Sequence, residues 1–170
     1  MSAMTGLGSI GDILKHIPYR YPFILIDRLD AFEIGKWVRV IKNVTGNEWY
    51  FHGVAHELRV MPSMLLVESL AQSSGALAYY SGLMENISKP IIFFAGFDKC
   101  KFGCEVRPGD TLILECSLVR ALRDVIKVHG RASVAGTSAL ELTLTAVIRD
   151  IDATPSGARS APKSTKPKTR

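Results

Sequence analysis

One long segment of the chain repeats its apolar residues at helical spacing. Leu66, Leu70 and Leu77 are separated by four and seven residues, in a run that begins directly after Pro62. A proline is favoured at the first position of a helix because its fixed φ suits the helix and its missing N–H would have had no acceptor there. We therefore predict a long, mostly apolar helix over residues 63–84.

Apolar and polar residues alternate along much of the remaining chain, in segments rich in β-branched and aromatic residues, which is typical of strands with one buried face. The predicted strands are Phe23–Phe32, Trp37–Val44, Ile91–Phe97, Lys101–Val106, Thr111–Leu122, Val125–Ala135 and Ala139–Ile151. A mostly apolar helix needs cover on most of its sides. The pattern therefore favours an α+β fold in which an antiparallel sheet of about five to seven strands wraps around the long central helix.

The two ends of the chain lack the pattern of a packed element. Residues 153–170 contain no large apolar side chain and are rich in Pro, Ser, Thr, Lys and Arg, so burial cannot offset the entropy lost on ordering. We predict a disordered basic tail over residues 153–170 and a flexible N-terminus over residues 1–9. One domain then covers residues 10–152 and opens on a short helical stretch over Ile10–His16.

The net charge of +5 looks at first like a sign of nucleic-acid or membrane-surface binding. The distribution of the charge along the chain argues against that interpretation. Residues 1–150 carry 16 Lys and Arg against 15 Asp and Glu, a net of +1, whereas residues 151–170 carry five basic residues against one acidic residue, a net of +4. The folded part is nearly neutral, so we expect neither a nucleic-acid nor a membrane partner.

The cysteines and the N-terminus bear on the compartment. Cys100, Cys104 and Cys116 show neither a CxxC pattern nor the spacing of metal ligands, so we expect reduced thiols and no metal site. The first residues lack the basic and apolar regions of a signal peptide, and no apolar run reaches the roughly 18 residues of a membrane span. We expect a cytoplasmic protein.

Candidate chemistry begins on the predicted central helix. Glu68 and Gln72 are the polar residues that its apolar pattern does not explain, and their i, i+4 spacing puts them on one face. A carboxylate is costly to bury unless it is paired or functional, although a glutamate at the rim of the sheet bonded to a backbone N–H is the alternative. The amides at the helix start, from Ser63 onward, lie at the positive end of the helix dipole and can hold a carbonyl oxygen.

The loop before this helix supplies His52 and His56. A histidine near a carboxylate forms a natural acid and base pair. Histidines without a recurring pattern are also common as surface or structural residues, and the residues alone leave both interpretations open.

Five blocks of sequence carry a resemblance to a known family. They are PYRYPFILIDR (18–28), IKNVTGNE (41–48), VMPSMLLVESLAQSSG (60–75), FDKCKF (97–102) and VRPGD (106–110). In this order they resemble the (3R)-3-hydroxyacyl-acyl-carrier-protein dehydratases of type II fatty acid synthesis, over about residues 10–150. The resemblance implies the hotdog fold, a dimer as the working unit, no cofactor, and hydro-lyase activity on a thioester carried by an acyl carrier protein.

The resemblance also implies roles for residues. In that family a loop histidine removes the α-proton, a glutamate on the central helix of the other subunit assists loss of the hydroxyl as water, and the helix N-terminal amide holds the thioester carbonyl. Glu68 matches the carboxylate, Gln72 its companion, and Ser63 the amide position, where the family usually has glycine. Val54 falls at the position of the histidine, and Tyr19 replaces another histidine usual in the family.

Valine cannot transfer a proton, and three interpretations follow. In the first, the chain is a dehydratase in which His56 or His52 reaches the site. In the second, it is a subunit of reduced activity that binds acyl thioesters or supplies Glu68 across the interface to a histidine-bearing paralogue. The expected assembly is a homodimer, a heterodimer with a dehydratase paralogue, or a higher oligomer. The third interpretation is a hotdog thioesterase with Glu68 as general base. In all three we expect Ser63, Gln72 and Val54 to contact the thioester.

Two further sets of residues are candidates for binding the rest of the substrate. Three aromatic residues, which are also plausible core residues, would line a tunnel for an acyl chain: Phe93, Phe94 and Phe97. Four basic residues, which could equally be solvated, would dock an acidic carrier protein: Lys99, Lys101, Arg107 and Arg123.

Overall fold

A computed structural model describes residues 4–8, 10–15 and 17–152. Seven strands form one sheet in the order β1-β2-β3-β5-β6-β7-β4, and every neighbouring pair is antiparallel. The strands are β1 (Met4–Gly8), β2 (Arg28–Glu33), β3 (Trp37–Asn43), β4 (Pro90–Phe102), β5 (Thr111–Leu122), β6 (Val125–Val134) and β7 (Thr137–Asp150). The helices are α1 (Ile10–Leu14) and α2 (Ser63–Tyr80), and two 3-10 turns lie at Trp49–Phe51 and His56–Leu58.

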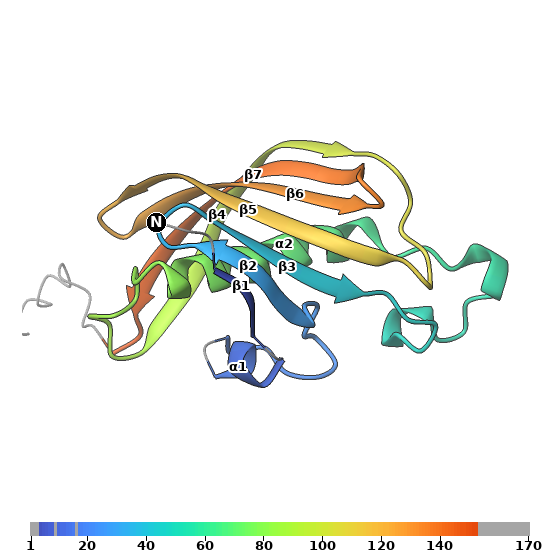
Figure 1. The fold of residues 1–170 in the computed structure, drawn as a ribbon, viewed down its shortest axis with the longest axis horizontal. Helices are drawn as coiled ribbons and strands as arrows, with labels where there is room; N and C mark the ends of the chain where they lie inside the picture. The colour runs from blue at the N-terminus through green and yellow to red at the C-terminus, as the bar shows by residue number, and fades with distance from the viewer. Residues whose placement is uncertain (1–3, 9, 16, 153–170) are drawn as a thin grey trace, which may run out of the picture.

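The long helix α2 runs along one face of the curved sheet (Figure 1). It contacts β3, β5 and β6, and Leu66, Leu70 and Leu77 are buried between helix and sheet. At Gly130 of β6 an added Cβ would lie 3.3 Å from a methyl group of Leu70, so the absence of a side chain there lets the helix approach the sheet closely. The predicted α+β fold, with a central helix wrapped by an antiparallel sheet, is confirmed.

The helix ends four residues before the predicted end. Gly82 has a φ of 72°, in the left-handed region that favours glycine. Its N–H donates to the Tyr79 carbonyl at 3.0 Å, and the Leu83 N–H donates to the Ala78 carbonyl at 3.1 Å. This pair of hydrogen bonds is a Schellman cap, which ends α2 at Tyr80.

Three strand predictions differ from the structure. The segment predicted as Phe23–Phe32 pairs as a strand only from Arg28, because the backbone before it bonds to a side chain of α2. The separate strand predicted over Lys101–Val106 is wrong: β4 continues without a break to Phe102, and residues 103–106 are not a strand. The pattern also missed β1, whose residues MTGLG offer few apolar side chains but extend the sheet along the edge of β2.

Some expectations concern residues outside the described part of the chain. The predicted basic tail over residues 153–170 and the end of the first predicted helix at His16 fall there. No helix in the described part of the chain has the length and hydropathy of a membrane-spanning segment.

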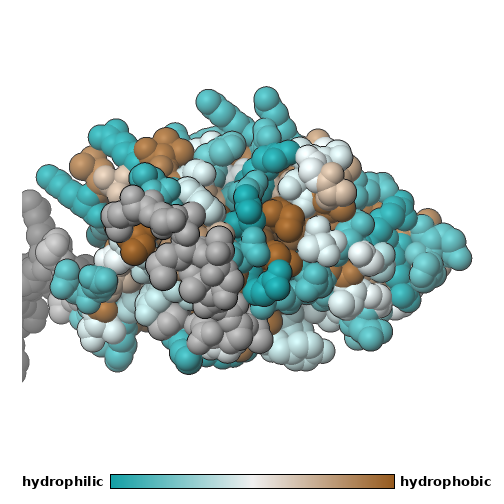
Figure 2. Space-filling model, in the orientation of Figure 1, coloured by the Kyte–Doolittle hydropathy of each residue, from teal (hydrophilic) through white to brown (hydrophobic). Residues whose placement is uncertain are grey.

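The two edges of the sheet differ. At one end β1 is a strand of five residues, and at the other end β4 is a strand of 13 residues paired only with β7 among the described strands. Phe93 and Phe97 of β4 are exposed, at 54% and 39%. On the face seen in Figure 2, apolar residues form separate small patches among hydrophilic ones. A long strand with one open edge and exposed aromatic side chains is a surface suited to pairing with another chain.

Candidate active site

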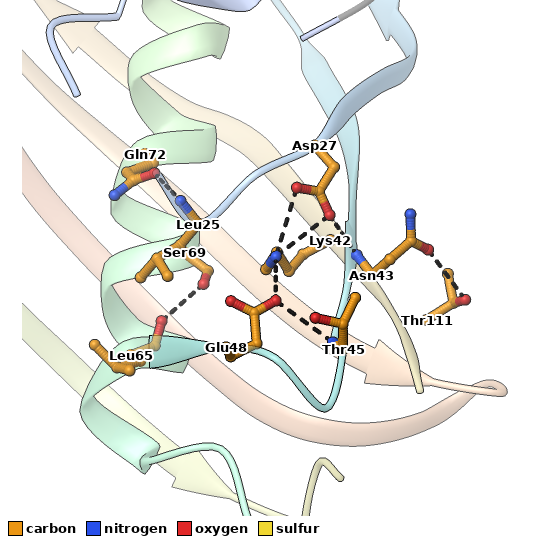
Figure 3. Close-up of polar contacts among 10 residues, drawn as sticks. All are labelled: Leu25, Asp27, Lys42, Asn43, Thr45, Glu48, Leu65, Ser69, Gln72 and Thr111. Atoms are coloured by element: carbon orange, nitrogen blue, oxygen red, sulfur yellow. Dashed lines mark hydrogen bonds and ion pairs between the residues drawn. The ribbon is translucent and has the colours of Figure 1, made fainter. Parts of the chain in front are cut away.

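Gln72 joins α2 to the segment before β2. Its Nε2 donates to Glu68 Oε1 at 2.9 Å and to the Phe23 carbonyl at 2.8 Å. Its Oε1 accepts the Leu25 N–H at 2.9 Å, the bond drawn in Figure 3. The side chain is fully buried. Because an oxygen faces an N–H and a nitrogen faces two oxygens, the neighbours fix the orientation of the amide. Gln72 therefore holds the Glu68 carboxylate and the backbone at residues 23–25 in one arrangement.

Glu68 is half-buried on the same face of α2. Burial raises the pKa of its carboxyl above the usual range, and the hydrogen bond from Gln72 opposes part of that shift. A raised pKa favours the protonated form of a carboxyl, which is the direction that a general acid requires. The hydrogen bond that the structure gives Glu68 comes from a side chain, so the pairing predicted from the i, i+4 spacing is present.

The first residue of α2, Ser63, lies five residues before Glu68. Ser63 is exposed, and Pro62 precedes it without a side-chain cap. The Leu65 N–H donates to the Pro62 carbonyl at 2.8 Å, whereas the first amides of any helix lack an intrahelical acceptor. At 1.5 Å per residue, the Ser63 amide is about 7.5 Å from Glu68 along the helix axis. In an acyl thioester, the carbonyl oxygen and the next carbons of the chain are closer together than this. The Ser63 amide and Glu68 would therefore hold different parts of one ligand.

The root of the loop before α2 is fixed by buried charges. Lys42 is 5% exposed, and its Nζ lies 2.7 Å from Glu48 Oε1 and 3.4 Å from Asp27 Oδ2. Asp27 Oδ2 also accepts the Asn43 N–H at 2.6 Å, and Glu48 Oε1 accepts the Thr45 N–H at 3.4 Å (Figure 3). A buried lysine is tolerated only when it is paired in this way. These contacts anchor the loop where it leaves β3.

Val54 lies further along this loop and is half-buried. Its N–H donates to the Phe51 carbonyl at 3.1 Å, and its carbonyl accepts Arg59 Nε at 3.1 Å. Arg59 Nη1 also donates to the Gly46 carbonyl at 3.3 Å. The guanidinium therefore joins the start of the loop, at Gly46, to its middle, at Val54. Sequence reasoning did not select Arg59.

The two loop histidines are exposed. His52 follows the first 3-10 turn, and His56 opens the second. Among the described residues, no hydrogen bond or ion pair joins either histidine to Glu68. The structure therefore brings Glu68 and Gln72 together, and it records no contact of this kind for the histidines.

Tyr19 is a site neighbour that sequence reasoning did not select. Its ring packs against Phe23 with centroids 6.2 Å apart, and burial and the charge of Glu68 both raise the pKa of its phenol. The signal was present in the PYRYPF block, where Tyr19 replaces a histidine usual in the resembling family. The residue lay far from Glu68 in sequence, and the bond from Gln72 to Phe23 is what brings the two segments together.

A cavity of about 220 Å³ lies beside Tyr19. Its walls are mainly apolar and come from the segment before β2, from α2 and from β4; they include Ile17, Tyr19, Ala71, Gly75, Ile92 and Phe94. Of the three phenylalanines expected to line a tunnel, Phe94 borders this cavity, whereas Phe93 and Phe97 are exposed. Within the described residues, no group of three or more His, Cys, Asp or Glu is placed to hold a metal ion.

Comparisons with known proteins agree with this architecture. The family model of the FabA-like domain matches residues 17–143. The 3-hydroxyacyl-acyl-carrier-protein dehydratase FabZ of Halalkalibacterium halodurans is 48% identical over 141 residues, which are 83% of this chain and 99% of that protein.

Solved structures share the fold at low sequence identity. A chain of the dehydratase heterocomplex ApeI:P from Xenorhabdus doucetiae superposes with a TM-score of 0.68 at 13% identity, covering 82% of this chain and 91% of that one. A hot-dog-like protein from Thermanaerovibrio acidaminovorans gives 0.56 at 11% identity, covering 71% and 86%. The fold is the hotdog fold, and the family match over most of the chain shows that it belongs to the FabA-like family, alongside the FabZ 3-hydroxyacyl-acyl-carrier-protein dehydratases.

Proposed function

We propose that this chain is a dehydratase subunit of acyl-chain biosynthesis in the cytoplasm, which binds acyl-carrier-protein thioesters and contributes Glu68 to an active site completed by the histidine of a partner subunit. The observation that carries the proposal is the contrast within one chain. Glu68 is half-buried and held by Gln72 at 2.9 Å, whereas Val54 is the residue that we align with the loop histidine of the family.

The reaction divides between the two subunits. The partner's histidine takes the α-proton of the 3-hydroxyacyl thioester, and the electron pair forms the double bond between the α and β carbons. The carboxyl of Glu68 gives its proton to the β-hydroxyl, which leaves as water. The raised pKa of Glu68 supports this assignment, because a carboxyl that keeps its proton closer to neutral pH is able to act as the acid. The amide at Ser63 would hold the thioester carbonyl.

The open edge of β4 supports a partner. Because β4 has 13 residues and one unpaired edge in the described sheet, a second hotdog subunit can extend the sheet across it. A neighbour in fold is named as a dehydratase heterocomplex, which supports a heterodimer with a paralogue as well as a homodimer. In a heterodimer, one of the two shared sites combines the partner's histidine with Glu68 of this chain. The other site has Val54 in place of a histidine.

The experiment compares the purified chain alone with the chain co-purified with a FabZ-type paralogue that carries the loop histidine. Dehydration of a 3-hydroxyacyl-acyl-carrier-protein is followed by mass spectrometry. We expect little or no product from the chain alone, and product together with a stable complex when the paralogue is present. Rapid dehydration by the chain alone that is lost in His56→Ala or His52→Ala would contradict the proposal and favour the first interpretation of the sequence.

The thioesterase alternative is tested on the same samples. Free thiol released from the acyl thioester is measured for the wild-type chain and for Glu68→Gln. Release that depends on Glu68 would support hydrolysis, and absence of release excludes it.

A further inference from the structure

We propose that Tyr19 is a specificity-determining residue of the Glu68 site: its phenol hydroxyl donates a hydrogen bond to the 3-hydroxyl oxygen of the bound acyl chain, so that the site prefers 3-hydroxyacyl groups over unsubstituted ones. This inference rests on the function proposed above. It adds a residue of this chain that recognises the 3-hydroxyl of the substrate independently of the partner's histidine.

The placement of Tyr19 follows from Gln72. The Gln72 side chain bonds to Glu68 on α2 and to the Phe23 carbonyl, and the Phe23 ring packs against the Tyr19 ring. One buried amide therefore holds the segment that carries Tyr19 against the helix face that carries Glu68. The side chains come from two segments far apart in sequence, yet they are fixed by a common contact.

The cavity lies further along the same helix face. Ala71 and Gly75 border it, and they follow Glu68 by three and seven residues, which keeps them on the face of Glu68. Tyr19 borders the same cavity. In the proposed binding mode, the acyl chain runs from Glu68 along this helix face into the cavity that Tyr19 borders. Its first polar substituent, the 3-hydroxyl, lies near Glu68 and Tyr19, and the rest of the chain needs no polar contact.

The hydroxyl of Tyr19 is available as a donor. Among the described residues, the structure records no hydrogen bond from it to another group, and its phenol stays protonated because burial and the charge of Glu68 raise its pKa further above neutral pH. Glu68 in its ionised form only accepts hydrogen bonds, and in its protonated form gives away its one proton. Tyr19 thus supplies a donor that does not depend on the protonation of Glu68.

The test measures binding of two probes to the full chain by calorimetry: 3-hydroxyoctanoyl pantetheine and octanoyl pantetheine, both as amides that cannot be hydrolysed. We expect the wild-type chain to bind the hydroxy probe about 3- to 10-fold more tightly, the range of one neutral hydrogen bond. Tyr19→Phe should lose this preference while its affinity for the octanoyl probe stays within about twofold. Tyr19→His, which keeps a donor, should retain part of the preference.

Tyr21→Phe is the matched control, because Tyr21 lies two residues away and is 84% exposed. It should leave both affinities unchanged. If Tyr19→Phe keeps the full preference for the hydroxy probe, the assignment of Tyr19 is wrong while the proposed function stands. If neither probe binds the wild-type chain, alone or in the complex with the paralogue, the proposed function fails and the assignment fails with it.

Discussion

The α2 half of the candidate site and the loop half are built in opposite ways. On α2, the polar groups of Gln72 each have a partner, and they hold the carboxylate of Glu68. In the loop, Trp49 Nε1 and Tyr50 Oη are buried without a hydrogen-bond partner among the described residues, and Val54 offers no acid or base. Under the proposed function, the α2 half therefore supplies a positioned carboxyl group, whereas the loop half of this chain supplies no group at Val54 that could transfer a proton.

The loop is nevertheless well anchored. Lys42 fixes its root through Glu48, and Arg59 ties Val54 to Gly46. The lack of a proton-transfer group at Val54 is therefore a matter of the side chain and its immediate contacts, and is not a sign of a missing loop. Variants that break one half of the site or restore the other therefore separate the contributions of the two halves.

The largest expected effect comes from restoring the loop. Val54→His should raise the dehydration rate of the chain alone by about 10²- to 10⁴-fold, the range that general acid and base groups contribute. The rate of 3-hydroxyacyl thioester dehydration measures it. Val54→Gln, which adds a polar side chain without a base, is the control and should leave the rate low. A rate as low as that of Val54→Gln would mean that the loop contacts of Arg59 also have to change.

Breaking the loop root should cost the most stability. Lys42→Met leaves the Glu48 carboxylate, whose side chain is only 13% exposed, without its cation, so we expect the free energy of unfolding to fall by about 3 kcal/mol. Denaturant titration measures it. The double variant Lys42→Met with Glu48→Gln removes the stranded charge and should recover part of the loss. A loss below about 1 kcal/mol for the single variant would show that Lys42 does not anchor the loop.

Breaking the α2 half should have a somewhat smaller effect on stability. Gln72→Leu removes three hydrogen bonds and leaves the buried Leu25 N–H without its acceptor, so we expect a loss of about 2 kcal/mol in the free energy of unfolding. Ser69→Ala, which loses a single bond to the Leu65 carbonyl, is the control on the same helix and should cost less than half as much. Equal losses for the two variants would contradict the central position given to Gln72.

The smallest effect concerns the pH dependence of stability. Because burial raises the pKa of Glu68 in the folded chain, the unfolded chain releases this proton first as the pH rises, and the folded state loses stability between the ordinary pKa of glutamate and the raised one. Glu68→Gln does not titrate. We expect its unfolding temperature, relative to wild type, to be higher at pH 8 than at pH 4. A constant difference across this range would mean that Glu68 is not perturbed.

The sequence was sufficient to predict the helix and the Glu68–Gln72 pair, because both follow from local periodicity. The i, i+4 spacing of Glu68 and Gln72 is a property of any helix, and the structure places a hydrogen bond there. Contacts between distant segments were beyond that reasoning. The bonds from Gln72 to residues 23 and 25 replaced strand pairing that the alternation of the segment predicted, and they brought Tyr19 toward Glu68.

Two further misses have the same origin. The strand β1 has a weak pattern of its own and exists through its pairing with β2, so no local signal could have revealed it. The break predicted after Phe97 was absent because β4 pairs with β7 from Pro90 to Phe102 and takes up irregularities in register on the way. The local pattern predicts the secondary structure that a segment favours, whereas pairing with a neighbouring strand determines where a strand ends.

The most direct test of the central claim uses a heterodimer in which the helix glutamate of the histidine-bearing partner has been replaced by glutamine. In that complex the one remaining carboxylate of the two sites is Glu68, opposite the partner's histidine. The rate of 3-hydroxyacyl-acyl-carrier-protein dehydration is measured with wild-type Glu68, with Glu68→Gln, and with Glu85→Gln as a control at an exposed glutamate. We predict activity that is lost by about 10²-fold or more in Glu68→Gln and kept in Glu85→Gln. Activity unaffected by Glu68→Gln, or no activity with wild-type Glu68 in a stable complex, would contradict the claim that this chain supplies the carboxylate.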